Sequence, residues 1–488
     1  MQVVNYRSAL EQRNRRIILE NLANAGGEKQ FLKLRDETEL PQDTFEHHLA
    51  ILTRNNIISV VGDTVRLERK TPLCYIFDSP NIPYIYLGLL GGERKERSEA
   101  ETETALKLLQ KENLQFSRVT VFTTEKGKKE WEGVAPQNVE WKLLEDREIR
   151  RIETIESKVE ANLADLVKNY IVVMDCTCLT KPATIAYYKI ASKHNIPLIY
   201  VYEDRKELTW ILSREDLKKK LLPPQKQKEK VREKTPLEEA RHIKIYQNIF
   251  KSEKERWKRA LEKLASDGKS VGIRDLGRRA GVKPNTLTYI IKSLKGKGIV
   301  TYIPKLCAEL THKTPLCYIF GSKKVPYAYL GLLGRREGRS EAETQTAQTL
   351  LKEEIEKQKP PEEKSQKGEV TFDMVIVFES YKYVSEWEGV APKNIYWRLL
   401  DDEEITSVET IETKVEEVLK ELIRTDIVIM DCTGLTKPAT IAYYKLAERY
   451  LVPLVYVYED EKELTWLVSK EDLKKQLLAA TEKEKMQD

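Results

Sequence analysis

Two nearly identical segments, Asp175–Lys189 and Asp431–Lys445, carry the residues best suited to chemistry in this chain. Each segment joins an apolar stretch to a helical pattern through an acid, two threonines and a lysine, with a proline in the first helical turn. Hydroxyl groups and an ammonium group beside a helix N-terminus suit a phosphate or a ribose. The candidate ligand-binding residues from these segments are Thr177, Thr180, Lys181, Thr433, Gly434, Thr436 and Lys437.

A second polar loop follows an earlier apolar stretch in each half of the chain. Both loops combine glycine with arginine and lead into the sequence Ser-Glu-Ala-Glu, at Ser98 and at Ser340, which predicts a capping box. A glycine-rich turn at a helix N-terminus, with arginines beside it, forms an anion site, and a tight turn with solvated arginines is the alternative. The candidates here are Gly91, Gly92, Arg94, Arg97, Gly334, Arg335, Arg336 and Arg339.

Other common chemistries find little support in the sequence. Neither polar loop matches the glycine pattern of a dinucleotide fold or of a P-loop NTPase. Cys176 and Cys178 are close together, but the second half has a glycine at the second position, so packing explains them better than a metal site. The five histidines do not recur between the halves. We therefore expect no metal and no cofactor, and we interpret the repeated tryptophans Trp131, Trp141 and Trp210 as core residues.

The two halves of the chain repeat one another beyond these loops. Thr71–Phe77 returns at Thr314–Phe320, and Trp131–Pro136 returns at Trp387–Pro392. The first copy predicts strands over 83–91, 118–124, 139–145, 170–175 and 196–203, with helices from 98, over 154–167 and over 179–194. This alternation predicts the α/β class, with two Rossmann-like domains that each have an open, mostly parallel sheet and helices on both faces. Ligands bind such sheets beyond the C-terminal ends of the strands, where both polar loops lie.

A shorter segment precedes each α/β copy. Residues 12–70 and 253–303 each show the pattern of three helices followed by a β-ribbon, which is typical of a winged helix-turn-helix. We therefore predict four domains. They are a winged helix-turn-helix at 1–70, α/β copy one at 71–222, a linker with a second winged helix-turn-helix at 223–313, and α/β copy two at 314–488.

The two helix-turn-helix segments differ sharply in charge. Residues 251–313 contain 16 Lys and Arg against 6 Asp and Glu, whereas residues 1–70 contain 11 against 10. Because contacts to phosphates supply most non-specific DNA affinity, the second segment is the better candidate for binding double-stranded DNA, and a basic face for a protein partner is the alternative. We expect the first segment to serve packing or dimerisation. The candidate DNA-binding residues are Arg274, Arg278, Arg279, Lys283, Asn285, Thr286, Thr288 and Lys292.

Bulk composition excludes several classes of protein. The chain has 488 residues, of which 41% are apolar and 33% charged, with a formal net charge of only +5. The N-terminus has no apolar segment of a signal peptide, and no stretch is long and apolar enough to span a membrane. Six cysteines are too few for a disulfide scaffold. We therefore expect a cytoplasmic protein that does not bind membranes.

The loop sequences resemble those of a known family. Asp431-Cys-Thr433-Gly434-Leu-Thr436-Lys437 and its counterpart from Asp175 to Lys181 are similar to the strand–loop–helix signature of CARF domains, the CRISPR-associated Rossmann fold. Leu179 and Leu435 replace the usual second glycine, and Cys178 replaces the first glycine in copy one. Fusion to a winged helix is common in that family.

The resemblance implies a ligand, cyclic oligoadenylate, which is the second messenger of type III CRISPR antiviral defence. We expect cyclic tetra-adenylate, bound where two copies pair across a two-fold axis. The two copies of one chain would form that pair, and further dimerisation stays open. The loop arginines would bind phosphates and the threonines ribose or phosphate oxygens.

Two functions follow from this resemblance. In the first, the ligand controls DNA binding by the second helix-turn-helix. In the alternative, the chain is a metal-independent ring nuclease with the winged helices as a scaffold. A ribose 2′-OH would then attack the adjacent phosphate, and Lys181 and Lys437 would be the catalytic residues that neutralise the developing charge.

Overall fold

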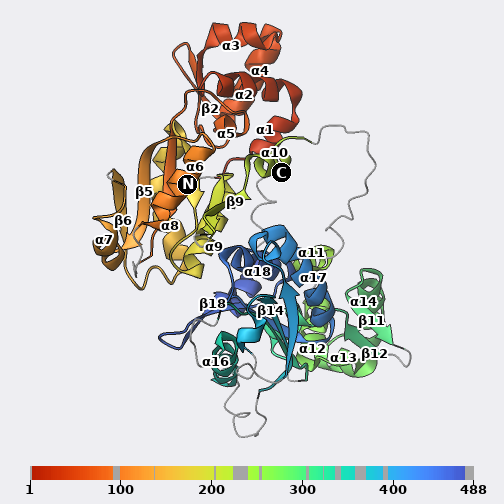
Figure 1. Ribbon diagram of the computed structural model, residues 1–488. Helices are drawn as coiled ribbons and strands as arrows, with labels where there is room; N and C mark the ends of the chain where they lie inside the picture. The colour runs from red at the N-terminus through yellow and green to blue at the C-terminus, as the bar shows by residue number, and fades with distance from the viewer. Residues whose placement is uncertain are drawn as a thin grey trace. The chain divides into compact units, whose positions relative to one another are not determined.

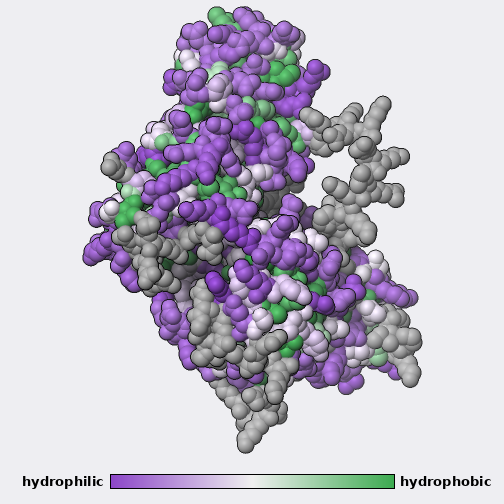
Figure 2. All heavy atoms as spheres, viewed as in Figure 1, coloured by the Kyte–Doolittle hydropathy of each residue, from purple (hydrophilic) through white to green (hydrophobic). Residues whose placement is uncertain are grey.

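The chain folds into two compact units, residues 1–230 and 231–488, which are described separately (Figure 1). The computed structural model describes residues 3–91, 99–136, 138–202, 205–223, 240–251, 255–303, 307–322, 324–335, 342–357, 370–387 and 394–478. The face seen in Figure 2 is mostly hydrophilic with scattered apolar residues. Among the described helices, none combines the length and the apolar character needed to cross a lipid bilayer.

The first unit begins with a small helical region. Its elements are α1 (Tyr6–Glu11), α2 (Arg13–Asn24), β1 (Glu28–Gln30), α3 (Phe31–Thr38), α4 (Gln42–Arg54), β2 (Ile58–Val61), β3 (Thr64–Leu67) and α5 (Leu73–Ile76). The strands form an antiparallel sheet in the order β1-β3-β2. Apolar residues of α2 and α4, including Leu19 and Leu49, share one core with β3. The winged helix-turn-helix interpretation of this region stays a prediction.

A six-stranded sheet follows in the same unit. Its elements are β4 (Tyr84–Leu89), α6 (Glu101–Lys111), β5 (Phe116–Thr124), α7 (Glu125–Trp131), β6 (Val139–Leu144), α8 (Ile152–Asn169), β7 (Ile171–Asp175), α9 (Lys181–His194), β8 (Leu198–Tyr202), β9 (Glu207–Leu212) and α10 (Arg214–Leu221). The strand order is β6-β5-β4-β7-β8-β9, and all neighbours are parallel except β8 and β9. The α/β prediction is confirmed, and β9 is an antiparallel edge strand beyond the one expected to close the sheet.

The second unit repeats this order. Its first part contains α11 (Ala240–Lys251), α12 (Glu255–Asp267), β10 (Val271–Gly272), α13 (Ile273–Ala280), α14 (Pro284–Gly296), β11 (Val300–Ile303), β12 (Cys307–Leu310) and α15 (Thr314–Phe320). The sheet then runs through β13 (Tyr327–Leu332), α16 (Glu343–Lys357), β14 (Phe372–Ser380), η1 (Val384–Trp387), β15 (Ile395–Leu400), η2 (Glu404–Thr406), α17 (Val408–Thr425), β16 (Ile427–Asp431), α18 (Lys437–Tyr450), β17 (Leu454–Tyr458), β18 (Glu463–Val468) and α19 (Lys470–Leu478). Its strand order, β15-β14-β13-β16-β17-β18, matches that of the first unit.

The strand order places both polar loops of each copy at one point of the sheet. β4 and β7 are parallel neighbours, but the chain leaves β4 toward β5 on one side and leaves β7 toward β8 on the other. A crevice opens where connections diverge in this way, outside the carboxyl ends of the strands. β13 and β16 form the same switch point in the second unit.

The predicted capping box at the start of α6 is wrong. This helix begins at Glu101, and Ala100 is its N-cap residue with no side-chain cap. The Glu101 side chain is buried. Ser98 and Ser340 lie outside the described residues.

Candidate functional site

A buried aspartate shapes the loop at the end of β7. One carboxylate oxygen of Asp175 accepts a hydrogen bond from the hydroxyl of Tyr86, on the neighbouring strand β4. The other accepts from the Thr177 backbone N–H at 2.8 Å and from the Thr177 hydroxyl. That hydroxyl oxygen in turn accepts from the Val201 N–H at 2.9 Å. The loop is therefore fastened to strands on both of its sides.

The same arrangement recurs in copy two. Tyr329 donates to Asp431, which also accepts from the Thr433 N–H at 2.8 Å and the Thr433 hydroxyl at 2.5 Å. The Val457 N–H donates to the Thr433 hydroxyl oxygen at 2.9 Å. Thr177 and Thr433, which were predicted to bind the ligand, thus both have hydroxyls that hold the loop together.

Burial raises the pKa of Tyr86 and of Tyr329 well above the usual tyrosine range, and the adjacent aspartate adds to the effect. Both phenols therefore stay protonated at neutral pH and donate to the carboxylate. Gly88 and Gly331 leave the space that these two rings fill, because a Cβ at either glycine would lie 2.5 Å from a ring carbon.

The second threonine of each loop starts the following helix. Thr180 is the N-cap residue of α9, where its hydroxyl oxygen accepts from the Ala183 N–H at 3.4 Å and its hydroxyl donates to the Ile149 carbonyl at 2.7 Å. Thr436 caps α18 in the same way and donates to the Ile405 carbonyl at 2.8 Å.

The two candidate lysines begin these helices. Lys181 and Lys437 are the first residues of α9 and α18, each followed by proline, and both are half-buried. A helix N-terminus carries a partial positive charge from its aligned peptide dipoles. Each lysine therefore adds a full charge where the backbone already favours an anion.

The leucines that replace glycine take a glycine-like backbone conformation. Leu179 has φ of 68° and Leu435 has φ of 58°. Leucine rarely adopts this left-handed region, at a cost on the order of 1 kcal/mol. The two loops therefore share the same strained backbone position.

The structure brings the two polar loops of copy two together. A Cβ at Gly334, in the loop after β13, would lie 3.0 Å from the Leu435 backbone nitrogen. In copy one the corresponding separation, from Gly91 to Leu179, is 4.0 Å. The remaining predicted loop residues, Gly92, Arg94, Arg97, Arg336 and Arg339, lie outside the described residues.

Arg335 lies beside an aromatic residue that the sequence did not single out. Its guanidinium carbon is 5.7 Å from the centre of the Tyr383 ring, and the Lys382 ammonium is 5.6 Å from the same centre. Copy one has Lys126 and Gly127 at the matching positions, so the aromatic ring belongs to copy two alone.

A buried acid also distinguishes copy two. Glu379, near the end of β14, is fully buried, and one of its carboxyl oxygens accepts from the Ser380 N–H at 2.7 Å. Burial, with Glu343 and Glu386 nearby, raises the pKa of Glu379 to about 9. Copy one has Thr123 here, whose hydroxyl donates to the Leu90 carbonyl at 2.9 Å.

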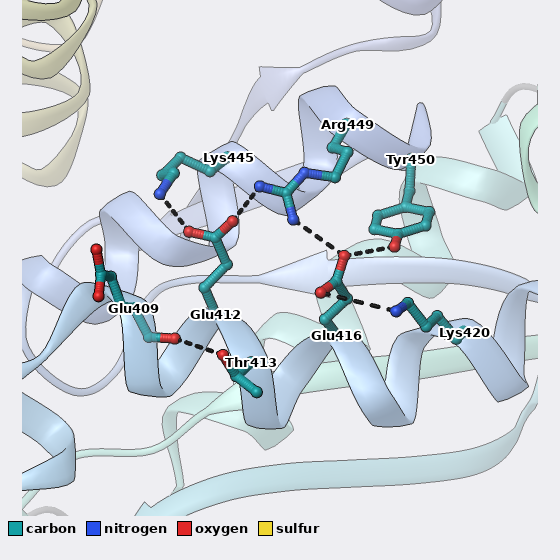
Figure 3. A network of polar contacts seen from close by, with 8 residues as sticks. All are labelled: Glu409, Glu412, Thr413, Glu416, Lys420, Lys445, Arg449 and Tyr450. Atoms are coloured by element: carbon teal, nitrogen blue, oxygen red, sulfur yellow. Dashed lines mark hydrogen bonds and ion pairs between the residues drawn. The ribbon is translucent and has the colours of Figure 1, made fainter. Parts of the chain in front are cut away.

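Ion pairs join the two helices that flank the copy-two loop (Figure 3). Glu412 of α17 accepts from Lys445 and Arg449 of α18. Glu416 accepts from Arg449 at 3.0 Å and from the Tyr450 hydroxyl at 2.5 Å. Because α18 starts at the candidate site, these contacts fix the direction of the helix whose N-terminus faces the site.

Copy one keeps both glutamates and the first lysine of this helix pair, but Lys193 and His194 replace Arg449 and Tyr450. Glu156 pairs with Lys189 at 2.5 Å, and Glu160 pairs with Lys193 at 2.7 Å. Glu160 also contacts His194, at 2.8 Å, where copy two has a tyrosine. Burial outweighs this neighbouring carboxylate and lowers the pKa of His194.

The predicted DNA-binding residues lie on α13 and α14 of the second unit, except Lys283, which is the N-cap residue of α14. Those with exposed side chains are Arg274, Arg278, Arg279, Lys283, Asn285 and Lys292, whereas Thr286 and Thr288 are half-buried. Tyr289 stands among them on α14 and is 68% exposed. Arg279 is bound to the protein itself, because its guanidinium pairs with Asp267 at 2.5 Å and with Asp275 at 3.4 Å.

No protein-family description matches this chain, and no curated protein matches it. Three solved structures are similar at low identity. Can2 from Sulfobacillus thermosulfidooxidans, in complex with cyclic tetra-adenylate (cA4), is 11% identical with a TM-score of 0.20, over 48% of this chain and 61% of its own. Enterococcus italicus Csm6, bound to cyclic hexa-2′-fluoro-hexa-dAMP, is 14% identical with a TM-score of 0.22, over 46% and 57%. Protein VC1899 from Vibrio cholerae is 8% identical with a TM-score of 0.20, over 70% and 98%.

The match spans less than two thirds of the Can2 and Csm6 chains.

Proposed function

We propose that this protein is a CARF-type sensor that binds cyclic oligoadenylate, with its two α/β copies forming one pseudo-symmetric site. The observation that carries the proposal is the repeated construction at the two switch points. In each copy a buried aspartate shapes a loop that ends in a threonine-capped helix, and a lysine is the first residue of that helix. Two such anion-binding ends suit a ring of nucleotides with phosphates on opposite sides.

Calorimetry with cyclic tetra-adenylate and the full chain tests this proposal. Lys181→Ala and Lys437→Ala should each weaken binding about tenfold, equivalent to roughly 1.4 kcal/mol, because each removes a charge-assisted contact to phosphate. The matched control is Lys193→Ala, which removes a lysine from the far end of α9, where it pairs with Glu160. No binding by the wild-type chain, or equal loss in all three variants, would contradict the proposal.

A ring nuclease is the second candidate, and the two lysines favour it. Each lies at a helix N-terminus, where positive charge could stabilise a phosphate that gains charge during the reaction. The ribose 2′-oxygen would form a bond to the adjacent phosphorus as the bond to the 5′-oxygen breaks, which leaves a 2′,3′-cyclic phosphate and a free 5′-hydroxyl.

Incubation with labelled cyclic tetra-adenylate in EDTA decides between binding and cleavage. A ring nuclease yields linear products that disappear in the Lys181→Ala/Lys437→Ala double variant. An intact ring after prolonged incubation with the wild-type chain would leave the sensor as the function.

We also propose that the second helix-turn-helix segment binds double-stranded DNA. Asn285, Tyr289 and Lys292 are exposed at the spacing of one side of α14, and Lys283 is exposed at its N-cap. Affinity should fall steeply as salt rises, and Arg278→Ala and Lys283→Ala should each lower the salt slope by about one. Arg279→Ala is expected to lower stability instead, because it breaks the pair with Asp267. Binding that is insensitive to salt would contradict this part.

A further inference from the structure

Two buried tryptophans are hydrogen-bonded to the loops after β4 and β13. Trp131, the last residue of α7, donates its indole N–H to the Gly91 carbonyl at 2.9 Å. Trp387, the last residue of η1, donates to the Gly334 carbonyl at 2.8 Å. Both side chains are fully buried. The sequence predicted Trp131 only as a core residue, and the bond shows a second role.

Packing alone does not account for a tryptophan at these two positions. The segments that carry them differ, since α7 is an α-helix and η1 a 3₁₀-helix, and the six residues before each tryptophan match only at one lysine and one glutamate. A leucine or phenylalanine could fill an apolar space, but a buried indole N–H requires an acceptor. In both copies that acceptor is a loop glycine far away in the chain. The two copies therefore share the tryptophan and its bond to the loop.

The hydrogen bond from Trp387 fixes the Gly334 carbonyl and, with it, the next backbone N–H. The Gly334 carbonyl and the Arg335 N–H belong to one planar trans peptide, so they point in opposite directions. Because the carbonyl faces the buried indole, the Arg335 N–H is aimed away from Trp387. The exposed Arg335 side chain leaves the same residue and lies over Tyr383. The orientation of this one peptide therefore determines the direction of the Arg335 N–H and the point from which the Arg335 side chain leaves the backbone.

We propose that Trp131 and Trp387 are positioning residues, which hold the Gly91 and Gly334 peptides in the orientation that receives a phosphate of the ligand. The inference rests on the proposed cyclic oligoadenylate site. A loop that is ordered before binding loses less conformational entropy when the ligand arrives, so the benefit appears as affinity.

Phenylalanine substitutions test the inference in the full chain. Trp131→Phe and Trp387→Phe keep an aromatic ring and remove the donor, and each should raise the Kd for cyclic tetra-adenylate roughly fivefold, the value of one ordinary hydrogen bond. The matched control is Trp210→Phe. Its indole N–H donates to Glu112 at 3.1 Å from the edge strand β9, outside both loops, so the Kd should not change.

Hydrogen exchange without ligand supplies an independent readout. Backbone amides of 88–91 should exchange faster in Trp131→Phe, and those of 331–335 faster in Trp387→Phe, whereas Trp210→Phe leaves both segments at the wild-type rate. If either substitution prevents folding, the histidine variant at that position restores an N–H donor on a smaller ring and should regain part of the protection.

The outcomes separate this inference from the proposed function. A wild-type chain that binds no cyclic tetra-adenylate removes the proposed function, while the exchange rates still report whether the indoles order the loops. Wild-type affinity together with unchanged exchange in both phenylalanine variants overturns the positioning role. An equal loss of affinity in Trp210→Phe overturns it as well, because loss of an indole N–H outside the loops would then have the same effect.

Discussion

Copy one and copy two hold the loop after β7 and the loop after β16 with the same hydrogen bonds, but differ in several of the neighbouring side chains. In both copies the aspartate accepts from its loop threonine N–H at 2.8 Å, and a strand N–H donates to the threonine hydroxyl at 2.9 Å. The differences are Cys178 against Gly434, Thr123 against Glu379, and His194 against Tyr450. The comparison shows that hydrogen bonds to the backbone fix the loop shape, while neighbouring side chains can differ in size and charge.

The largest expected effect comes from giving copy two the residue of copy one. In Gly434→Cys, the new Cβ would lie 2.4 Å from the Leu332 carbonyl oxygen and 2.7 Å from the Leu333 Cα, so the main chain would have to move. We expect a loss of about 2–4 kcal/mol in the free energy of unfolding, measured by denaturant titration.

The reciprocal variant, Cys178→Gly, is the control for this effect. It removes a small buried side chain without creating a clash, so its cost should stay near 1 kcal/mol. Equal stability of Gly434→Cys and the wild-type chain would show that the two loops are interchangeable, which contradicts the comparison.

A middle-sized effect is expected from the pH dependence of Glu379. Its pKa is raised to about 9 in the folded chain, above the ordinary value of 4.5, so the folded state keeps a proton that the unfolded state loses. Its stabilising contribution is therefore complete below about pH 4.5 and is lost as the pH rises toward 9. Glu379→Gln, which keeps the acceptor for Ser380, should flatten this slope and raise the melting temperature at pH 8.

Thermal unfolding at pH 5 and at pH 8 measures this slope. Glu386→Gln, at a half-buried neighbour on η1, serves as the control and should reduce the slope only slightly, because burial is the main cause of the raised Glu379 pKa. A Glu379→Gln chain with the wild-type pH profile would show that Glu379 does not hold the proton.

The smallest expected effect distinguishes the two helix pairs in acid. Burial lowers the pKa of His194 from its ordinary 6.5, so the unfolded state binds a proton more readily than the folded state. Stability therefore falls as the pH drops below about 6.5. The Glu160 carboxylate reduces this loss of stability because it raises the His194 pKa, whereas the nearby Lys193 charge enlarges the loss because it lowers that pKa. In hydrogen exchange, the opening free energy of the α8 amides should fall by less than about 1 kcal/mol between pH 7 and pH 5. His194→Gln should reduce that loss.

The corresponding helix of copy two is an internal reference for this measurement. Tyr450 replaces the histidine there, so exchange in α17 should show no matching change over the same pH range. Equal acid sensitivity of α8 and α17 would remove the assigned role of His194.

The sequence predicted the features that depend on local pattern. The helix expected over 179–194, with Pro182 in its first turn, is α9, which begins at Lys181, and the apolar stretch before Asp175 gives β7. The parallel sheet follows from the alternation of such stretches with helices.

Features that depend on distant contacts could not be predicted. The indole of Trp131 looks like any core residue until its acceptor, Gly91, is brought beneath it by the fold. The sequence around Glu379 does not indicate that this acid is fully buried in the folded chain. The predicted cap at Ser98 fails because α6 begins at Glu101, with Ala100 as its N-cap residue.

The duplication within one chain has a consequence for composition. A symmetric dimer of a single α/β domain would carry the same residue at both switch points, so any substitution would change both halves at once. Here each molecule carries one Cys178 loop and one Gly434 loop in a fixed one-to-one ratio. One half can therefore diverge while the other retains its sequence.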